Sequence, residues 1–148
     1  MKYALSLALA ALVTTAAAAQ DADEKSTENM IISADDVELD DFRWVKRPLV
    51  VFADTPNDPR FAEQMEYLEG GLSALEARDV IVITDTDPEA RTEIRRKLRP
   101  RGFGLVGIAK DGSIFLRKPT PWAIREITRS IDKLPTRQQE LRDRGSGS

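Results

Sequence analysis

Two aspartates, Asp54 and Asp58, are the side chains in this sequence best placed to carry chemistry. They bracket a loop that follows a short apolar run, and carboxylates at such a place can bind a cation or act as a general base. A simpler interpretation also explains them, because aspartates are frequent in turns and Asp58 precedes Pro59 as a helix cap does. A metal site would need more oxygen ligands than the loop provides, so we expect no metal here.

The sequence contains neither cysteine nor histidine. Thiol–disulfide chemistry needs a thiolate, and histidine is the commonest general base and metal ligand. No glycine-rich phosphate loop of standard spacing is present either. We therefore predict a non-catalytic protein with no cofactor. The alternative is a thiol-independent enzyme that uses Asp54 and Asp58, and a third possibility is a structural component of the cell envelope.

A basic stretch is a second candidate site, comprising Arg91, Arg95, Arg96, Lys97, Arg99 and Arg101. Such a stretch can bind a polyanion, and we mark Arg95, Arg96, Lys97, Arg99 and Arg101 as a possible polyanion patch. The plainer interpretation is a solvated helix face, on which Glu89 and Glu93 pair with the cations. The net charge of −3 and the expected export argue against nucleic acid as the partner.

The first nineteen residues have the pattern of a signal peptide. Lys2 gives a basic start, Ala4–Val13 is an apolar run, and Ala17–Ala19 supplies small residues before Gln20. The run is too short for a transmembrane helix, and a buried N-terminal helix is the alternative. We expect a periplasmic or secreted protein with no stable membrane anchor after cleavage.

The next segment, residues 20–41, is strongly acidic. From Asp21 to Asp41 it holds nine acidic residues and one lysine, without periodic apolar positions. This composition predicts a solvated linker. Two alternatives stay open: the segment folds back on the basic surface, or its few apolar residues (Met30 to Ile32, Val37 and Leu39) dock on the domain.

The rest of the chain alternates between strand and helix patterns. Apolar, β-branched runs predict strands at 48–53, 79–84 and 103–109, and the Asp111-Gly112 hairpin signal predicts a fourth strand at 113–117. Helices are expected from Pro59, with Gly70-Gly71 as a kink or a break, from Asp87-Pro88 to Leu98, and from Thr120-Pro121 to Pro135. Trp44 and Trp122, near element ends, are expected to pack at the core or its edge.

Strands joined through a helix run parallel, and the Lys110-Asp111-Gly112 hairpin makes the last pair antiparallel. The result is an α/β fold with a thioredoxin-like, four-stranded mixed sheet flanked by helices. In thioredoxins the redox motif follows the first strand, here at Thr55–Arg60, and a cis-proline precedes the third strand, here at Gly104. Neither hallmark is present. The chain is therefore not expected to be a thiol–disulfide oxidoreductase.

Several passages together resemble the bacterial family named domain of unknown function 4174, a family that is similar to modules of vertebrate sushi-repeat and coiled-coil extracellular-matrix proteins. The resemblance covers roughly Phe42 to Arg142. It lies in the passages Arg47–Ala53, Glu76–Ile83, Phe103–Arg117 and Ile131–Glu140, the last resembling the family ending Asp-x-hydrophobic-Pro-x-Arg-x-x-Glu. One departure is Ile114-Phe115, where relatives carry a basic residue.

The resemblance implies a domain at 42–142 without an established reaction, followed by a flexible tail at 143–148. We expect an exported binding or interaction domain whose partner is unknown but is a protein or an envelope component. The candidate ligand or partner surface comprises Asp54, Asp58, Arg60, Lys110, Asp111, Arg117, Arg137 and Glu140.

Overall fold

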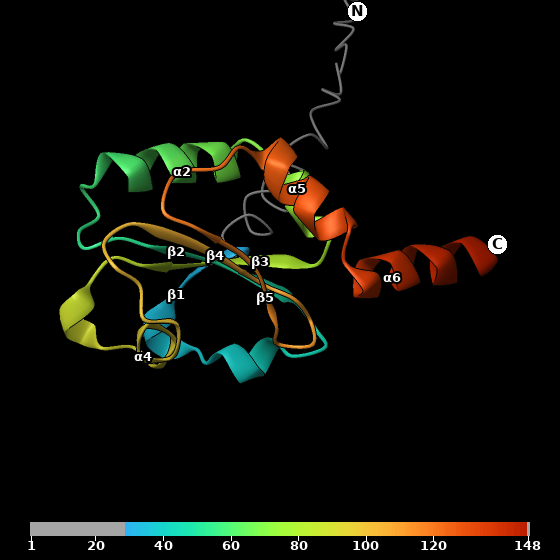
Figure 1. The fold of residues 1–148 in the computed structure, drawn as a ribbon, viewed down its shortest axis with the longest axis horizontal. Coiled ribbons are helices and arrows are strands. Elements are labelled where there is room, and N and C mark those ends of the chain that lie inside the picture. The colour runs from blue at the N-terminus through green and yellow to red at the C-terminus, as the bar shows by residue number, and fades with distance from the viewer. Residues whose placement is uncertain (1–28, 148) are drawn as a thin grey trace, which may run out of the picture.

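A computed structural model describes residues 29–147 of the chain, which form a five-stranded mixed sheet with helices on both faces (Figure 1). The strand order is β1-β3-β2-β4-β5. The strands are β1 (Ile31–Ser33), β2 (Arg47–Phe52), β3 (Val80–Asp85), β4 (Gly104–Ile108) and β5 (Ile114–Lys118). β1 and β2 each run parallel to β3, whereas β4 is antiparallel to both β2 and β5.

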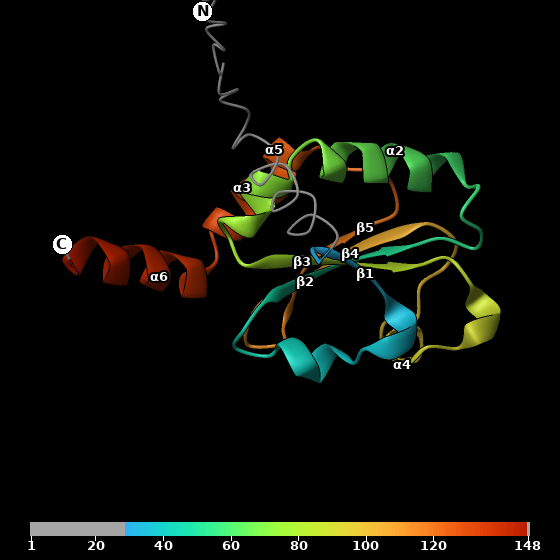
Figure 2. The same ribbon diagram turned by 180° about the vertical axis from the view of Figure 1, so that it is seen from behind.

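The helices form two layers. One face of the sheet is covered by α2 (Pro59–Glu69), α3 (Leu72–Glu76) and α5 (Ile124–Asp132). The other is covered by α4 (Glu93–Leu98) and the 3₁₀ turns η1 (Ala34–Asp36) and η2 (Leu39–Phe42), with a further turn, η3 (Pro88–Ala90), before α4. The last helix, α6 (Pro135–Ser146), leaves the edge of the sheet and projects to one side (Figure 2).

Strand β2 is the centre of the core and is buried along its whole length. Leu49 and Val51 pack with the layer of α2, α3 and α5, whereas Val50 and Phe52 pack with the layer of α4. Side chains alternate between faces of a sheet, so a strand covered on both faces needs a continuous apolar run. Such runs predicted β2, β3 and β4, whereas β5 was predicted from the hairpin that precedes it, and all four strands are present.

The fifth strand, β1, comes from the segment predicted to be an acidic linker. Of this segment the structure describes residues 29–41, in which the apolar side chains pack on the domain while the acidic side chains stay exposed. Ile31 pairs with Val82, and Ala34 is buried against the layer of α4. The apolar residues of this segment therefore dock on the domain, as one alternative proposed: Met30 and Ile31 pack on one core cluster, and Ile32, Val37 and Leu39 pack on the other.

Three helix boundaries differ from the predicted ones. Pro88 opens only the 3₁₀ turn η3, after which Arg91 takes a left-handed conformation (φ 46°) and Thr92 caps α4. The last predicted helix begins at Ile124, not at Pro121, and residues 143–146 of the expected flexible tail continue α6.

The predicted signal peptide, residues 1–19, lies outside the residues that the structure describes. Within residues 29–147, no helix has the length and hydropathy needed to cross a membrane.

Candidate functional site

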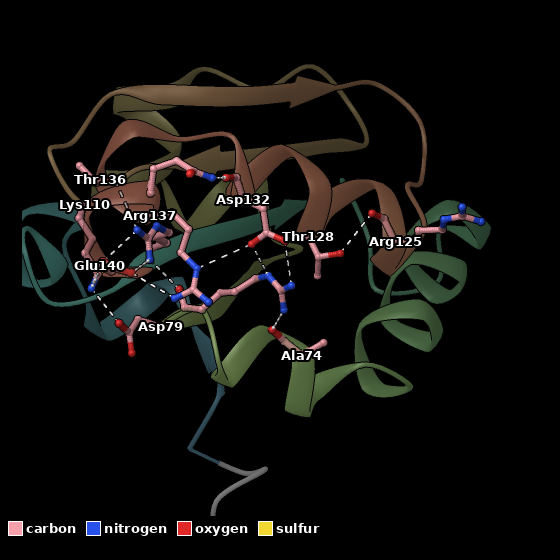
Figure 3. Close-up of polar contacts among 12 residues, drawn as sticks. Ala74, Asp79, Lys110, Arg125, Thr128, Asp132, Thr136, Arg137 and Glu140 are labelled. Atoms are coloured by element: carbon pink, nitrogen blue, oxygen red, sulfur yellow. Dashed lines mark hydrogen bonds and ion pairs between the residues drawn. The ribbon is translucent and has the colours of Figure 1, made fainter. Parts of the chain in front are cut away.

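A network of charged side chains lies at the edge of the sheet where β2 and β3 begin, and it contains three of the predicted site residues (Figure 3). Arg47, the first residue of β2, is 1% exposed and donates to Glu140 of α6 at 3.0 and 3.3 Å. The same guanidinium donates to the backbone carbonyl of Arg78 at 2.8 Å. An arginine this deeply buried requires a charged partner, and the first turns of α6 provide it.

Glu140 is shared by several cations. The ammonium of Lys110 lies 2.7 Å from Glu140 and also 2.8 Å from Asp79. Arg137, on the same helix as Glu140, lies 3.3 Å from it. Partial burial alone would raise the pKa of Glu140, but hydrogen bonds from Lys110 and Arg47 outweigh it and lower the pKa to about 2.

A second ion pair joins α5 to the segment after α3. Arg78 forms a two-pronged contact with Asp132, both distances being 2.9 Å. The hydrogen bond from Arg78 holds the pKa of Asp132 below its usual value, and Arg137 adds a contact at 3.7 Å. The structure thus brings together Lys110, Arg137 and Glu140, three residues of the candidate surface. Their charges are directed at one another, which is the arrangement of a structural tie for α6.

Asp111 has a local role in the hairpin between β4 and β5. Its carboxylate accepts hydrogen bonds from the hydroxyl and the backbone N–H of Ser113, at 2.6 and 2.9 Å, and these lower its pKa. This is the geometry of a turn-forming aspartate.

The opposite edge of the sheet, where β2 and β3 end, holds the predicted aspartates. Asp58 caps α2 by accepting from the N–H of Arg60 at 2.9 Å, and the Arg60 side chain donates to the same carboxylate at 2.9 and 3.2 Å. The Arg60 hydrogen bonds lower the pKa of Asp58, which makes it a weaker base. Asp54 is exposed in the loop before it. The cap interpretation accounts for Asp58, and nothing in the loop joins the two aspartates to a common ligand.

Arg95 does not belong to a surface patch, contrary to the prediction. Its guanidinium contacts the buried Asp85 at 2.8 and 3.0 Å, donates to the carbonyl of Ala53, and lies over the ring of Phe52. Thr92 donates to the other oxygen of Asp85 at 2.6 Å. Every charge of this buried cluster is matched, so it fixes α4 to the ends of β2 and β3. Helical spacing alone does not reveal that Arg95 points inward.

The rest of the predicted patch divides in two. Lys97 pairs with Glu93 at 3.2 Å and lies 3.9 Å from Asp40, and Arg96 faces the acidic turn η1. Here the described part of the acidic segment does fold back on the basic helix. Arg99 and Arg101, by contrast, lie beyond α4 and line a separate pocket.

The pocket lined by Arg99 and Arg101, here called the basic pocket, opens beside the start of β4 and has a volume of about 370 Å³. Its walls include Arg99, Arg101, Phe103, Gly104, Arg117 and Lys118. No carboxylate is among its lining residues, so four cations face a common space. Gly104, the residue in the expected cis-proline position, pairs with Phe52 and places the pocket at the end of β2.

Two contacts hold the cations of the basic pocket in place. Arg117 donates to the carbonyl of Leu98 at 3.1 Å, and Lys118 lies over the ring of Trp122 at 4.4 Å. Neither contact neutralises the cation. The side chains of Arg99 and Arg101 form no ion pair within the described part of the chain. The pocket is therefore suited to an anionic group, which would gain charge-assisted hydrogen bonds from the arginines.

The sequence analysis missed Lys118, Phe103 and the convergence itself. The sequence did carry a signal for this site. Arg117 and Lys118 are adjacent at the end of one predicted strand, and Arg99 and Arg101 directly precede the strand with which it pairs. Pairing of β4 with β5 brings these two basic stretches to the same end of the sheet. Within residues 29–147, no three acidic side chains approach closely enough to hold a metal ion.

Solved structures to which this chain is similar include peroxiredoxins. The reduced 2-Cys peroxiredoxin of Plasmodium vivax superposes with a TM-score of 0.58 at 15% identity, covering 70% of this chain and 85% of that one. Thioredoxin peroxidase I of Plasmodium yoelii gives a TM-score of 0.53 at 17% identity, covering 70% and 80%. These similarities show the thioredoxin-like fold alone. Because this chain has no cysteine, it has no redox-active thiol.

No curated protein matches the sequence. A family profile does match residues 38–140, which include all of the sheet except β1 and the helices up to the first turns of α6. The chain therefore belongs to the family of the domain of unknown function DUF4174.

Proposed function

We propose that this protein is an exported, non-catalytic binding domain that holds an anionic ligand in the basic pocket. The observation that carries the proposal is the convergence of Arg99, Arg101, Arg117 and Lys118 on one space without a carboxylate in its walls. Ligands of open α/β sheets commonly bind at the ends of the strands, and this pocket lies at the end of β2. Export is supported by the sequence pattern of residues 1–19.

An enzyme built on Asp54 and Asp58 has less support. Asp58 is engaged by the helix N-terminus and by Arg60, and its lowered pKa opposes a role as general base. The ligand we propose is a sulfate- or phosphate-bearing envelope component, because guanidinium groups match the geometry of these anions.

Heparin affinity chromatography tests the proposal, with heparin as the sulfated probe. We expect the double variant Arg101→Gln/Lys118→Gln to elute at clearly lower salt than the unmodified protein. The matched control is Arg125→Gln/Arg129→Gln, which removes the same charge from exposed positions on α5. If the two double variants shift elution equally, retention reflects net charge, and the basic pocket is not the site.

A further inference from the structure

A second pocket lies on the same face of the sheet as α4, but at the edge where β2 begins. It has a volume of about 260 Å³, and we call it the apolar pocket. Its walls are mostly apolar and include Leu39, Phe42, Pro48, Leu98, Ile108 and Ile114. Neither the charged network nor the basic pocket uses this space. Its volume falls below the range of about 300–1,000 Å³ typical of drug-sized ligands, which suits a single apolar side chain.

The rim of the apolar pocket carries more positive than negative charge. Arg43, Lys46 and Lys97 face one carboxylate, Asp40. Asp40 already pairs with Arg43 at 2.9 Å and lies 3.9 Å from Lys97, which also pairs with Glu93 at 3.2 Å. Lys46 has no ion pair with any other described residue. A binding partner that brings carboxylates to this rim would complement the remaining charge.

Large apolar side chains stand exposed beside the pocket. Trp44 is 67% exposed, Val45 is 60% exposed and Ile114 is 47% exposed. Trp44 and Val45 lie in the chain between the rim residues Arg43 and Lys46, and Ile114 is itself part of the wall. A cluster of exposed apolar groups next to a pocket is typical of a protein-binding surface, where tryptophan is enriched.

The side chain of Trp44 points outward, and its backbone has a conformation that residues other than glycine rarely adopt. Its φ is 64°, in the left-handed region that glycine prefers. The N–H of Trp44 donates to the carbonyl of Lys110 at 2.8 Å, and the next two N–H groups both donate to the carbonyl of Phe42 at 2.9 Å. The turn is thus fixed by three hydrogen bonds while the indole itself stays in solvent. Strained residues of this kind concentrate at functional positions.

We propose that the apolar pocket and the exposed side chains of Trp44, Val45 and Ile114 bind an acidic segment of a protein partner. One large apolar side chain of that segment enters the pocket, and a flanking carboxylate pairs with Lys46. Small molecules fit the observations less well, because three exposed apolar side chains extend the contact beyond the pocket. This site is separate from the basic pocket, so either proposal can fail without the other.

Fluorescence of Trp44 can report binding directly. The chain has two tryptophans, and Trp122→Phe leaves Trp44 as the only one. The hydrogen bonds of Trp122 to Gln64 use its backbone, so this background variant keeps them. The probe is a capped pentapeptide with phenylalanine between two pairs of glutamates. Comparison peptides replace the phenylalanine by alanine or the glutamates by lysines.

We expect saturable binding of the glutamate–phenylalanine peptide, at least tenfold tighter than either comparison peptide. Ile114→Asp should weaken it at least tenfold. The control variant Tyr67→Asn removes an exposed apolar group from α2 and should leave it unchanged. Trp44→Asn should abolish binding, which for this variant is measured by line broadening in the NMR spectrum of the peptide. Its melting temperature should stay the same or rise, because asparagine tolerates a positive φ.

Several results would overturn the proposal. Equal binding of the phenylalanine and alanine peptides would mean that the pocket is not used, and equal binding of the lysine peptide would exclude charge complementarity. Equal affinity for free 4-phenylbutyrate would identify a small-molecule site instead. A Trp44 emission shift with phosphatidylglycerol vesicles but with none of the peptides would indicate a membrane surface.

Discussion

Arg47 is the most deeply buried member of the charged network at the edge where β2 and β3 begin. It opens the central strand, it is almost fully buried, and its main charged partner comes from the last helix, 93 residues later. Breaking a buried ion pair is costly because it leaves one charge uncompensated. Arg47 therefore makes Glu140 a requirement for stability and not only an accessory contact.

Glu140→Gln should lower the free energy of unfolding by about 3 kcal/mol at neutral pH, from the difference between a folded pKa of about 2 and an unfolded value of 4.5. A lowered pKa stabilises the fold above the unfolded pKa. For the unmodified protein this contribution should therefore be lost as the pH falls from about 5 towards 2. Urea unfolding across this pH range measures both effects.

Glu69→Gln serves as the control, because Glu69 is an exposed carboxylate on α2. It should change stability by less than about 0.5 kcal/mol. A Glu140→Gln variant whose stability falls as steeply below pH 5 as that of the unmodified protein would show that other carboxylates dominate the acid response.

Among the helices, the break between α2 and α3 has a specific cause at Gly71. A methyl group added there would lie 2.5 Å from Cγ1 of Ile124 in α5, and two other Ile124 carbons are within 2.9 Å. Gly70 ends α2, and Gly71 lets α5 cross closely over the junction. The sequence left open whether the glycine pair kinks or ends the helix, because the reason lies in a helix more than fifty residues further along the chain.

Gly71→Ala should destabilise the fold by about 1–3 kcal/mol, the usual cost of forcing extra atoms into a packed contact. Gly70→Ala is the matched control and should have a smaller effect, because its nearest neighbour is a backbone oxygen at 3.4 Å. In a thermal unfolding cycle, Ile124→Ala should partly compensate Gly71→Ala, giving a favourable coupling energy. Simple additivity of the two substitutions would contradict the close contact.

Elements with a strong local signal could be predicted, and those defined by their partners could not. Three strands with apolar runs, and a fourth predicted from the Asp111-Gly112 hairpin, are present within a residue or two of their predicted limits. Strand β1 was missed because Ile31–Ser33 is too short for periodicity and pairs only because the edge of β3 is available. The same holds for the candidate site residues. The sequence alone indicates that Asp58 caps a helix, whereas the inward direction of the Arg95 side chain depends on Asp85, which lies on another element.

At the scale of the whole molecule, acidic and basic side chains are concentrated in different regions of the described structure. The described acidic segment lies against α4, the buried ion pairs hold the two edges of the sheet, and uncompensated cations remain in the basic pocket. The net charge of −3 hides this arrangement. Because no carboxylate lines the basic pocket, anion binding there should weaken with salt even though the protein is acidic overall.

The export proposal also belongs to this scale. When the gene is expressed in a bacterium with a functional secretion system, the mature protein should begin at Gln20, because Ala17 and Ala19 fit the small-residue pockets of a signal peptidase. Intact-mass spectrometry of the periplasmic fraction measures this. Recovery of protein only in the cytoplasm, with residues 1–19 retained, would contradict export.

The tie between Arg47 and Glu140 also determines when the domain can finish folding during synthesis. Chains emerge from the ribosome N-terminus first at about 5–20 residues per second, so β2 is available several seconds before α6. Until Glu140 arrives, completing the sheet would bury Arg47 without its carboxylate. We expect this cost to delay closure of the nascent domain, which would give a translocation machinery that accepts unfolded polypeptides an interval in which to engage it.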